Sequence, residues 1–192
     1  MDGQRRAQAL TVFARITLAW LLLTAATAVA AEGPLLRRAT LFVADAAKSQ
    51  AFYAAIGFRT WLDWSGDQDP QNPSALPLKD PSVRSRIVIV AGQDDYSGMI
   101  GLLEMRDPAL SSNRKVADRL GIHDVMLVIE SDRDLDAFTA RVSELGGSIL
   151  RPPTAYQSNG PAGRKTGKSM LVRDPDGYVV EITRTTGLKP PD

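Results

Sequence analysis

The sequence contains no cysteine and only one histidine, His123, among its 192 residues. Without cysteine there are no disulfide cross-links, no thiolate metal sites and no cysteine nucleophile. The fold must therefore rest on its own apolar core. A chain of about 160 residues can form such a core, because a domain of that size buries roughly 70% of the surface of its unfolded chain.

An excess of charge of one sign is also absent, since 23 basic residues face 22 acidic ones. Residues 1–30 hold three of the basic and one of the acidic residues, so 20 basic and 21 acidic side chains remain beyond them. A net charge near −1 gives no electrostatic footprint for nucleic acid. The composition, 44% apolar and 23% charged, predicts one globular unit.

The first thirty residues have a different character from the rest. Arg5 and Arg6 precede an apolar run that ends in the small residues Ala28-Val-Ala30. This pattern predicts a secretory signal peptide over residues 1–30 and a periplasmic or secreted protein with no stable membrane insertion after cleavage. The alternative is a membrane anchor, but the run is shorter than the roughly 20 apolar residues that a spanning helix needs.

The pattern of apolar residues after the signal peptide predicts a strand, a helix and three further strands. Asp45 is the expected cap of the helix, and Gly57 follows its end. A polar loop with four prolines separates the second and third strands. The expected strands are 35–43, 58–64, 86–90 and 99–105, and the expected helix is 46–56.

The same order recurs in the second half of the chain. Pro152-Pro153 is expected to end a strand and to begin a long loop, because proline fixes φ and donates no hydrogen bond. Asp174-Pro-Asp-Gly177 has the residues of a tight turn. The expected strands are 122–129, 148–151, 168–173 and 178–184, and the expected helix is 132–146.

The predicted fold class is therefore α+β, with two tandem β-α-β-β-β modules in one domain over residues 31–192. Module one covers about 36–105, a linker covers 106–120, and module two covers about 121–184.

Three polar residues stand on predicted strands at positions of functional interest: His123, Glu104 and Glu181. Because alternate residues of a strand share a face, Glu104 is grouped with Leu102, and Glu181 with Thr183. If each sheet curls, all three polar groups are expected on a concave face. The alternative for each is structural, either a satisfied histidine or a strand glutamate that faces water.

These residues and two motifs carry a family resemblance. Phe52-Tyr53 with Gly57-Phe58, and Asp174-Pro-Asp-Gly177 followed by Glu181, resemble the vicinal oxygen chelate superfamily. That superfamily includes glyoxalase I, extradiol dioxygenases, fosfomycin-resistance thiol transferases and bleomycin-binding proteins. The resemblance covers roughly residues 36–184. It implies a curved, cup-shaped mixed sheet that binds a small molecule, in a monomer or in a homodimer that pairs modules between chains.

In metal-binding members the ligands come from the first and last strands of each module. The resemblance matches these places to Arg38, Glu104, His123 and Glu181. A guanidinium offers no lone pair to a cation, so Arg38 departs from the pattern. The other three would suit Mn, Fe, Ni or Zn. Glu104 and Glu181 would then also serve catalysis in a lyase or isomerase; the dioxygenase triad of two histidines and one carboxylate is not matched.

The rival interpretation is a metal-free protein that binds or sequesters a small molecule, as bleomycin-resistance proteins do. Arg38 would then pair with Glu104 or Glu181 and replace the charge of a cation. The segment 158–168 is expected to form a loop that attracts anions, so Arg164 and Lys168 join Arg38 as candidate substrate-binding residues. That segment has a simpler interpretation as a solvated loop. Whether the protein is an enzyme stays open at this point.

Overall fold

The computed structural model describes residues 33–67, 84–107, 109–110, 124–161 and 163–190. From Leu36 onward the described residues belong to one compact unit. The predicted signal peptide, His123 and most of the predicted linker lie outside the described residues. Within the described part of the chain, no helix is both long enough and apolar enough to cross a membrane.

The first module has the predicted order of elements. Its helix begins where Asp45 accepts hydrogen bonds from the backbone N–H groups of Ala47 and Lys48, at 2.9 and 3.1 Å. The chain leaves the helix through Gly57, whose φ of 111° suits glycine. The elements are β1 (Arg38–Phe42), α2 (Ala46–Ala55), β2 (Arg59–Asp67), β3 (Arg84–Ala91) and β4 (Met99–Asp107).

The second module repeats this order with a shorter helix than the sequence predicts. Asp134 caps the helix by accepting from the N–H groups of Asp136 and Ala137, so the helix cannot start at residue 132. After Arg141 the chain continues in turns that end at Gly146, where φ is 83°. The elements are β5 (Met126–Glu130), α3 (Leu135–Arg141), β6 (Ser148–Gly160), β7 (Gly163–Arg173) and β8 (Val179–Lys189).

The prediction that Pro152-Pro153 ends a strand is wrong. Strand β6 runs through both prolines, because the pairing with β7 shifts register between Arg151 and Thr154. The prolines lie in this irregularity, where a ladder tolerates residues that cannot donate a hydrogen bond. The segment 158–168 is accordingly no free loop: its described residues belong to the hairpin of β6 and β7, which ends at the pair Gly160 and Gly163.

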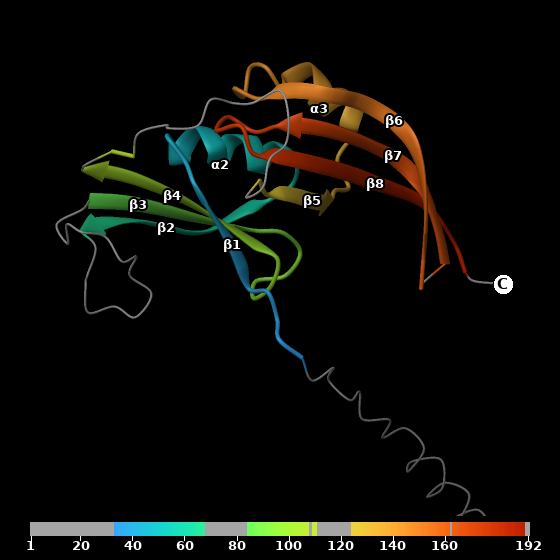
Figure 1. Ribbon diagram of the computed structural model, residues 1–192, viewed down its shortest axis with the longest axis horizontal. Coiled ribbons are helices and arrows are strands. Elements are labelled where there is room, and N and C mark those ends of the chain that lie inside the picture. The colour runs from blue at the N-terminus through green and yellow to red at the C-terminus, as the bar shows by residue number, and fades with distance from the viewer. Residues whose placement is uncertain (1–32, 68–83, 108, 111–123, 162, 191–192) are drawn as a thin grey trace, which may run out of the picture. The chain divides into compact units, whose positions relative to one another are not determined.

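Each module forms one mixed sheet of four strands. The strand orders are β1-β4-β3-β2 and β5-β8-β7-β6, with β1 parallel to β4, β5 parallel to β8 and the other pairs antiparallel. Figure 1 shows the curved strands β6, β7 and β8 extending past α3. Each sheet keeps two edge strands among the described residues, so neither closes into a barrel. The predicted fold class is confirmed.

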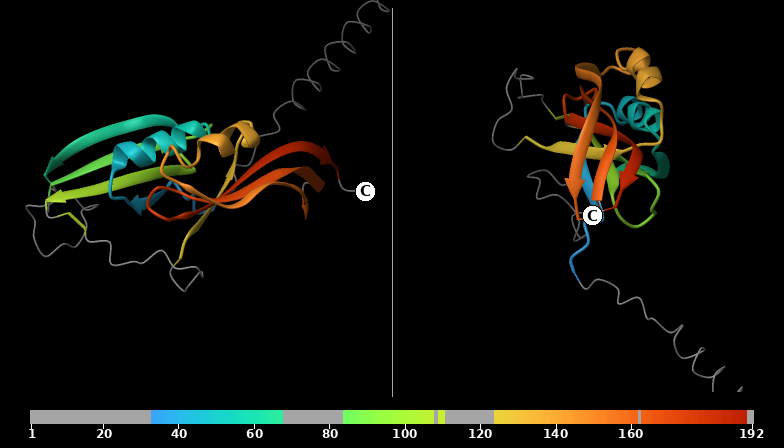
Figure 2. Two further views of the ribbon diagram at one scale, coloured as in Figure 1. Left: turned by 90° about the horizontal axis from the view of Figure 1, so that it is seen from above. Right: turned by 90° about the vertical axis from the view of Figure 1, so that its right-hand side faces the viewer.

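Both modules contribute to one hydrophobic core. The rings of Phe52 from α2 and Phe138 from α3 meet edge to face, with centroids 5.5 Å apart. The two helices lie side by side in Figures 1 and 2. Strand residues that face the helices complete the core, among them Leu41, Val88, Leu102, Val172, Val180 and Ile182.

The turn between β7 and β8 joins the two modules. The Asp176 carboxylate accepts from the Ala44 N–H at 2.7 Å and from the Ser49 hydroxyl at 2.8 Å, both in module one. The Tyr178 hydroxyl exchanges hydrogen bonds with the backbone of Phe42. The turn Asp174-Pro-Asp-Gly177, which the family resemblance places before a metal ligand, is therefore also a tether between the modules.

Candidate functional site

Each sheet has a side that packs on the helices and a side that does not, here called the helix-facing and helix-free faces. In β8, Val180 and Ile182 are fully buried in the core that the helices share. Glu181 stands between them and therefore points to the helix-free face.

Glu181 lies in a small polar cluster on that face. Its Oε1 atom accepts a hydrogen bond from the Ser169 hydroxyl at 3.1 Å, and Arg151 Nη2 lies 3.6 Å away. Arg151 also donates to the Ser169 hydroxyl at 2.6 Å. The cluster is partly open to solvent, since the Glu181 side chain is 29% exposed. Sequence reasoning missed Arg151 and Ser169, because their contact depends on the unpredicted pairing of β6 with β7.

The prediction that Glu104 shares a face with Glu181 is wrong. Glu104 has the parity of Leu102, which is fully buried against the helices. Its Oε2 atom accepts from the Ala46 N–H at 3.1 Å, and its Oε1 atom accepts from Arg106 Nε at 2.7 Å. The hydrogen bond from Arg106 is the main cause that holds the pKa of the Glu104 carboxyl below its usual value, and the bond from Ala46 adds to it. Glu104 thus serves the start of α2.

Arg38 lies on the helix-free face of the first sheet. Its Nε atom donates to the Thr40 hydroxyl at 3.1 Å, and the side chain lies over Gly101, where an added Cβ would meet Arg38 Cδ at 3.1 Å. No ion pair of Arg38 with Glu104 or Glu181 occurs among the described residues. The predicted pairing is therefore wrong: Arg106 is the partner of Glu104, and Arg151 is the partner of Glu181.

The donor set for a metal ion is incomplete in the described part of the chain. His123 lies outside it. No group of three histidine, aspartate or glutamate side chains suited to one metal ion occurs among the described residues. Glu104 points to the helix-facing side, and Arg38 has no lone pair to offer. The described residues thus do not fit the metal site that the resemblance implied.

An apolar row crosses the helix-free face of the first sheet. Trp64 of β2 pairs in register with Ile87, Ile87 with Leu103, and Leu103 with Phe42. The two ends of the row are open, with Trp64 44% and Phe42 42% exposed. Leu103 points to the helix-free face, and its neighbour Glu104 therefore points to the opposite one. Such an apolar row suits contact with an apolar ligand.

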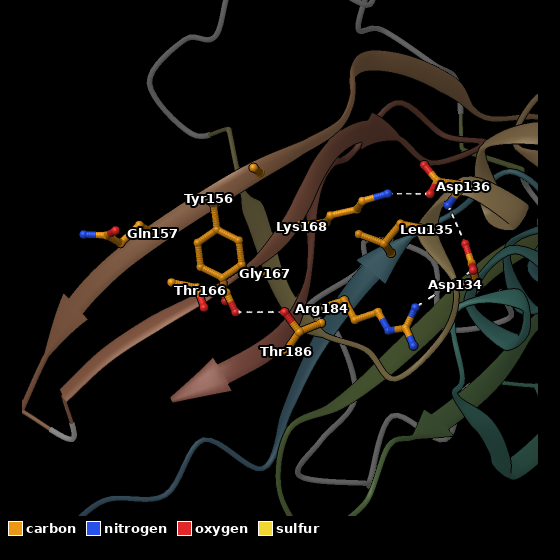
Figure 3. A pocket seen from close by; sticks show the side chains of 11 residues that line it. Asp134, Leu135, Asp136, Tyr156, Gln157, Thr166, Gly167, Lys168, Arg184 and Thr186 are labelled. Carbon is orange, nitrogen blue, oxygen red and sulfur yellow. Dashed lines mark hydrogen bonds and ion pairs between the residues drawn. The ribbon is translucent and has the colours of Figure 1, made fainter. Parts of the chain in front are cut away.

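Lys168 lines a separate cavity of about 690 Å³ beside the start of α3, whereas Arg164 lies exposed on β7 without lining it. Lys168 Nζ lies 2.6 Å from Asp136 Oδ2, and Arg184 Nη1 lies 4.0 Å from Asp134 Oδ2 (Figure 3). The cavity therefore carries two acidic and two basic side chains. Hydroxyl, amide and apolar groups make up the rest of its lining.

A comparison with protein families gives a match over residues 35–182 to the Glyoxalase/Bleomycin resistance protein/Dioxygenase superfamily. The chain belongs to this superfamily. The match spans both modules and agrees with the paired β-α-β-β-β architecture. A comparison with curated proteins gives no match.

One of the similar solved structures has a TM-score above 0.5 and shows the same fold at low sequence identity. A glyoxalase family protein from Bacillus cereus is 18% identical, with a TM-score of 0.57 over 82% of this chain and 99% of that one. A glyoxalase I mutant from Zea mays is 19% identical, with a TM-score of 0.47 over 77% of this chain and 45% of that one. TnmS3, an antibiotic binding protein from a Streptomyces species, is 19% identical, with a TM-score of 0.43 over 82% and 100%.

Divalent metals serve many enzymes of this superfamily. This chain shares the fold of that group. The donor set described above departs from the metal-binding pattern at Arg38 and Glu104.

Proposed function

We propose that this superfamily member binds a small organic molecule on the helix-free faces of its sheets, without a metal ion held by Glu104. One observation carries the proposal: the Glu104 carboxylate is engaged by Ala46 and Arg106 on the helix-facing side. Because Arg38 cannot ligate a cation either, two of the four implied ligand positions are lost. A binding or sequestering role is therefore favoured over a metal-centred lyase.

The proposed ligand has an apolar body and hydrogen-bonding groups. Trp64 and Phe42 offer partly exposed aromatic surface at the two ends of the apolar row. Arg38 offers guanidinium donors on the same face, over Gly101, and among the described residues its side chain donates to Thr40. In the second sheet, Glu181 provides an acceptor on the same kind of face.

Tryptophan fluorescence is a suitable first test of this proposal. Of the three tryptophans, one lies at position 20 in the predicted signal peptide, so the mature chain keeps only Trp61 and Trp64 on β2. Titration with bleomycin and a panel of aromatic natural products should quench this emission for at least one compound. Trp64→Phe should reduce the quenching, and Glu181→Gln should weaken binding. Glu144→Gln, an exposed change outside these faces, is the matched control.

A metal-dependent lyase or isomerase is the second candidate. It is favoured by the partial exposure of Glu181 on the helix-free face, where His123 would have to join it. Mn, Fe, Ni or Zn bound there would act as a Lewis acid on a substrate oxygen. Metal analysis of protein purified without chelators or an affinity tag tests this candidate. A stoichiometric metal that is lost in Glu181→Gln would favour it over the binding role.

We also propose export to the periplasm or the exterior, on the strength of the arginines and the small-residue triplet in residues 1–30. An exported protein would work apart from cytosolic glutathione, which agrees better with sequestering a compound than with glutathione-dependent chemistry. We further propose a homodimer, as the family resemblance implies. Sedimentation of the mature protein would test it.

A further inference from the structure

The cavity beside α3 is distinct from the helix-free faces described above. Its walls come from the start of α3 and from the outer halves of β6, β7 and β8. Lys168 and Arg184 belong to the helix-facing side of the second sheet, as their contacts with Asp136 and Asp134 require. A volume of about 690 Å³ lies within the range of known small-molecule sites.

The basic and the acidic side chains of the cavity lie on opposite walls. Lys168 and Arg184 are register partners on β7 and β8, so two like charges stand directly opposite each other on one wall. Asp134 and Asp136 stand together on the other wall, at the start of α3. Figure 3 shows the two basic side chains directed toward the two acidic ones. A purely anionic ligand would meet the aspartates, and a purely cationic one would meet the basic pair.

The two ion pairs of the cavity differ in distance. Lys168 and Asp136 form a direct contact at 2.6 Å. Arg184 approaches Asp134 only to 4.0 Å, and its guanidinium donates no hydrogen bond to the described residues. Asp134 uses Oδ1 to cap α3 and leaves Oδ2 toward the cavity. The backbone donors, that of Ala137 first, keep the pKa of the Asp134 carboxyl below its usual value.

We propose that this cavity binds a small zwitterion, an amino acid or a short peptide, between Arg184 and Asp134. The ligand carboxylate meets the guanidinium fork of Arg184, which is shaped for bidentate contact with carboxylates. The ligand ammonium meets Asp134 Oδ2. Leu135, which is buried, and Ala155 offer apolar contact for a side chain. The bound zwitterion would replace the 4.0 Å pair of Arg184 and Asp134 by two direct contacts. Because a zwitterion has no net charge, the total charge of the site would stay the same.

The test uses the mature protein and defined probes. The twenty standard amino acids and glycyl-L-leucine are screened by thermal shift, and the best binder is titrated by calorimetry beside its N-acetyl and amide derivatives. Each derivative lacks one of the two charges. We expect binding of the free zwitterion and at least about 10-fold weaker binding of either derivative, since a charge-assisted hydrogen bond is lost in each.

Two variants address the site without disturbing the fold. Asp134→Asn keeps a good helix cap and removes the charge, and Arg184→Gln removes the guanidinium. Each should weaken the best probe at least about 10-fold. Arg184→Lys should restore only part of the affinity, because it lacks the planar fork. Arg133→Gln is the matched control, since Arg133 is exposed next to α3 and does not line the cavity.

Several results would overturn the proposal. These are no binding by any probe, equal binding of a derivative that lacks one charge, or unchanged affinity in both Arg184→Gln and Asp134→Asn. Loss of the same probe in Glu181→Gln, with Arg184→Gln unaffected, would assign the binding to the helix-free face instead. Failure of this proposal therefore leaves the proposed function standing, and the converse also holds.

Discussion

The hydroxyl of Tyr53 donates a 2.9 Å hydrogen bond to Oδ2 of Asp174, which connects α2 of the first module to the β7–β8 turn of the second. Both residues are buried, at 0% and 2% exposure. The other oxygen of Asp174 accepts from the N–H groups of Asp176 and Tyr178. One carboxylate thus shapes the turn and joins the modules.

Tyr53→Phe should destabilise the protein while leaving its packing intact. The change removes the donor and leaves Asp174 Oδ2 buried without that partner, at a cost of about 1 to 3 kcal/mol. Thermal and urea unfolding measure the loss. Tyr96→Phe, which removes a hydroxyl from a side chain that is 57% exposed, is the control and should unfold like the wild type. Equal stability of both variants would contradict the tethering role.

The contribution of Asp174 to stability should fall as the pH rises from about 4 to about 6, whereas carboxyls with lowered pKa values, such as Glu104, contribute in the opposite direction. Burial raises the pKa of the Asp174 carboxyl from 3.8 to about 6, against the hydrogen bonds that lower it. The folded state therefore holds this proton more tightly than the unfolded state does. The stabilisation is complete below the unfolded value and is lost through pH 6, with a slope of up to about 1.4 kcal/mol per pH unit.

Asp174→Asn isolates this effect. The amide oxygen can still accept from the turn, and the amide group does not ionise. In urea unfolding at steps between pH 4 and pH 6.5, the difference in stability between variant and wild type should shift in favour of the variant as the pH rises. A constant difference over that range would show that Asp174 does not titrate there.

The fold was predictable because it depends on local signals. Alternating apolar residues defined most strands, and Asp45 and Gly57 marked the ends of α2 as expected. The error at Pro152-Pro153 arose because proline was weighed without its partner strand: only the pairing with β7 shows that the prolines lie at a register shift.

The site was predictable only in part. Glu181 was correctly separated by parity from the buried Val180 and Ile182. Glu104 was correctly grouped with Leu102. Whether these two residues point toward or away from the helices depends on which side of the sheet the helices cover. That choice depends on packing between distant segments. The Arg151 and Ser169 contacts likewise depend on long-range strand pairing.

Glu104→Gln and Glu181→Gln should separate a structural carboxylate from a binding one. Glu104→Gln removes the charged contact with Arg106 and the negative charge at the start of α2, which should cost about 1 kcal/mol of stability. It should leave ligand affinity unchanged. Glu181→Gln should weaken ligand binding and leave stability nearly unchanged. Melting curves and ligand titrations of both variants decide, and a pure stability effect in both would contradict a binding role for Glu181.

The mature chain should begin at Ala31, because cleavage is expected after the small-residue triplet Ala28-Val-Ala30. Expression in a Gram-negative host, followed by fractionation and intact-mass measurement, tests this. Ala28→Lys should block processing, since the cleavage site requires small residues. Full-length protein in the membrane fraction of wild-type cells would favour the anchor instead.

Arg38→Ala should change stability by no more than about 0.5 kcal/mol, because surface substitutions outside special contacts have small effects. Among the described residues the Arg38 side chain makes one hydrogen bond, the exposed one to Thr40, and Glu104 and Glu181 have Arg106 and Arg151 as their charged partners there. Under the proposed function the same variant should bind the ligand more weakly. Arg37→Ala, which removes the neighbouring guanidinium that stacks on Tyr96, is the control for a general loss of charge.

Arg38→His adds an imidazole on the helix-free face and thereby tests the metal-dependent alternative. If His123 and Glu181 already hold a metal ion, an additional ligand should raise the melting temperature in Mn, Ni or Zn. Under a metal-free binding role, these ions should act on wild type and variant alike. Thermal melts of both proteins with and without each ion distinguish the two. A large loss of stability in Arg38→Ala that a divalent ion restores would contradict the placement of Arg38 described here.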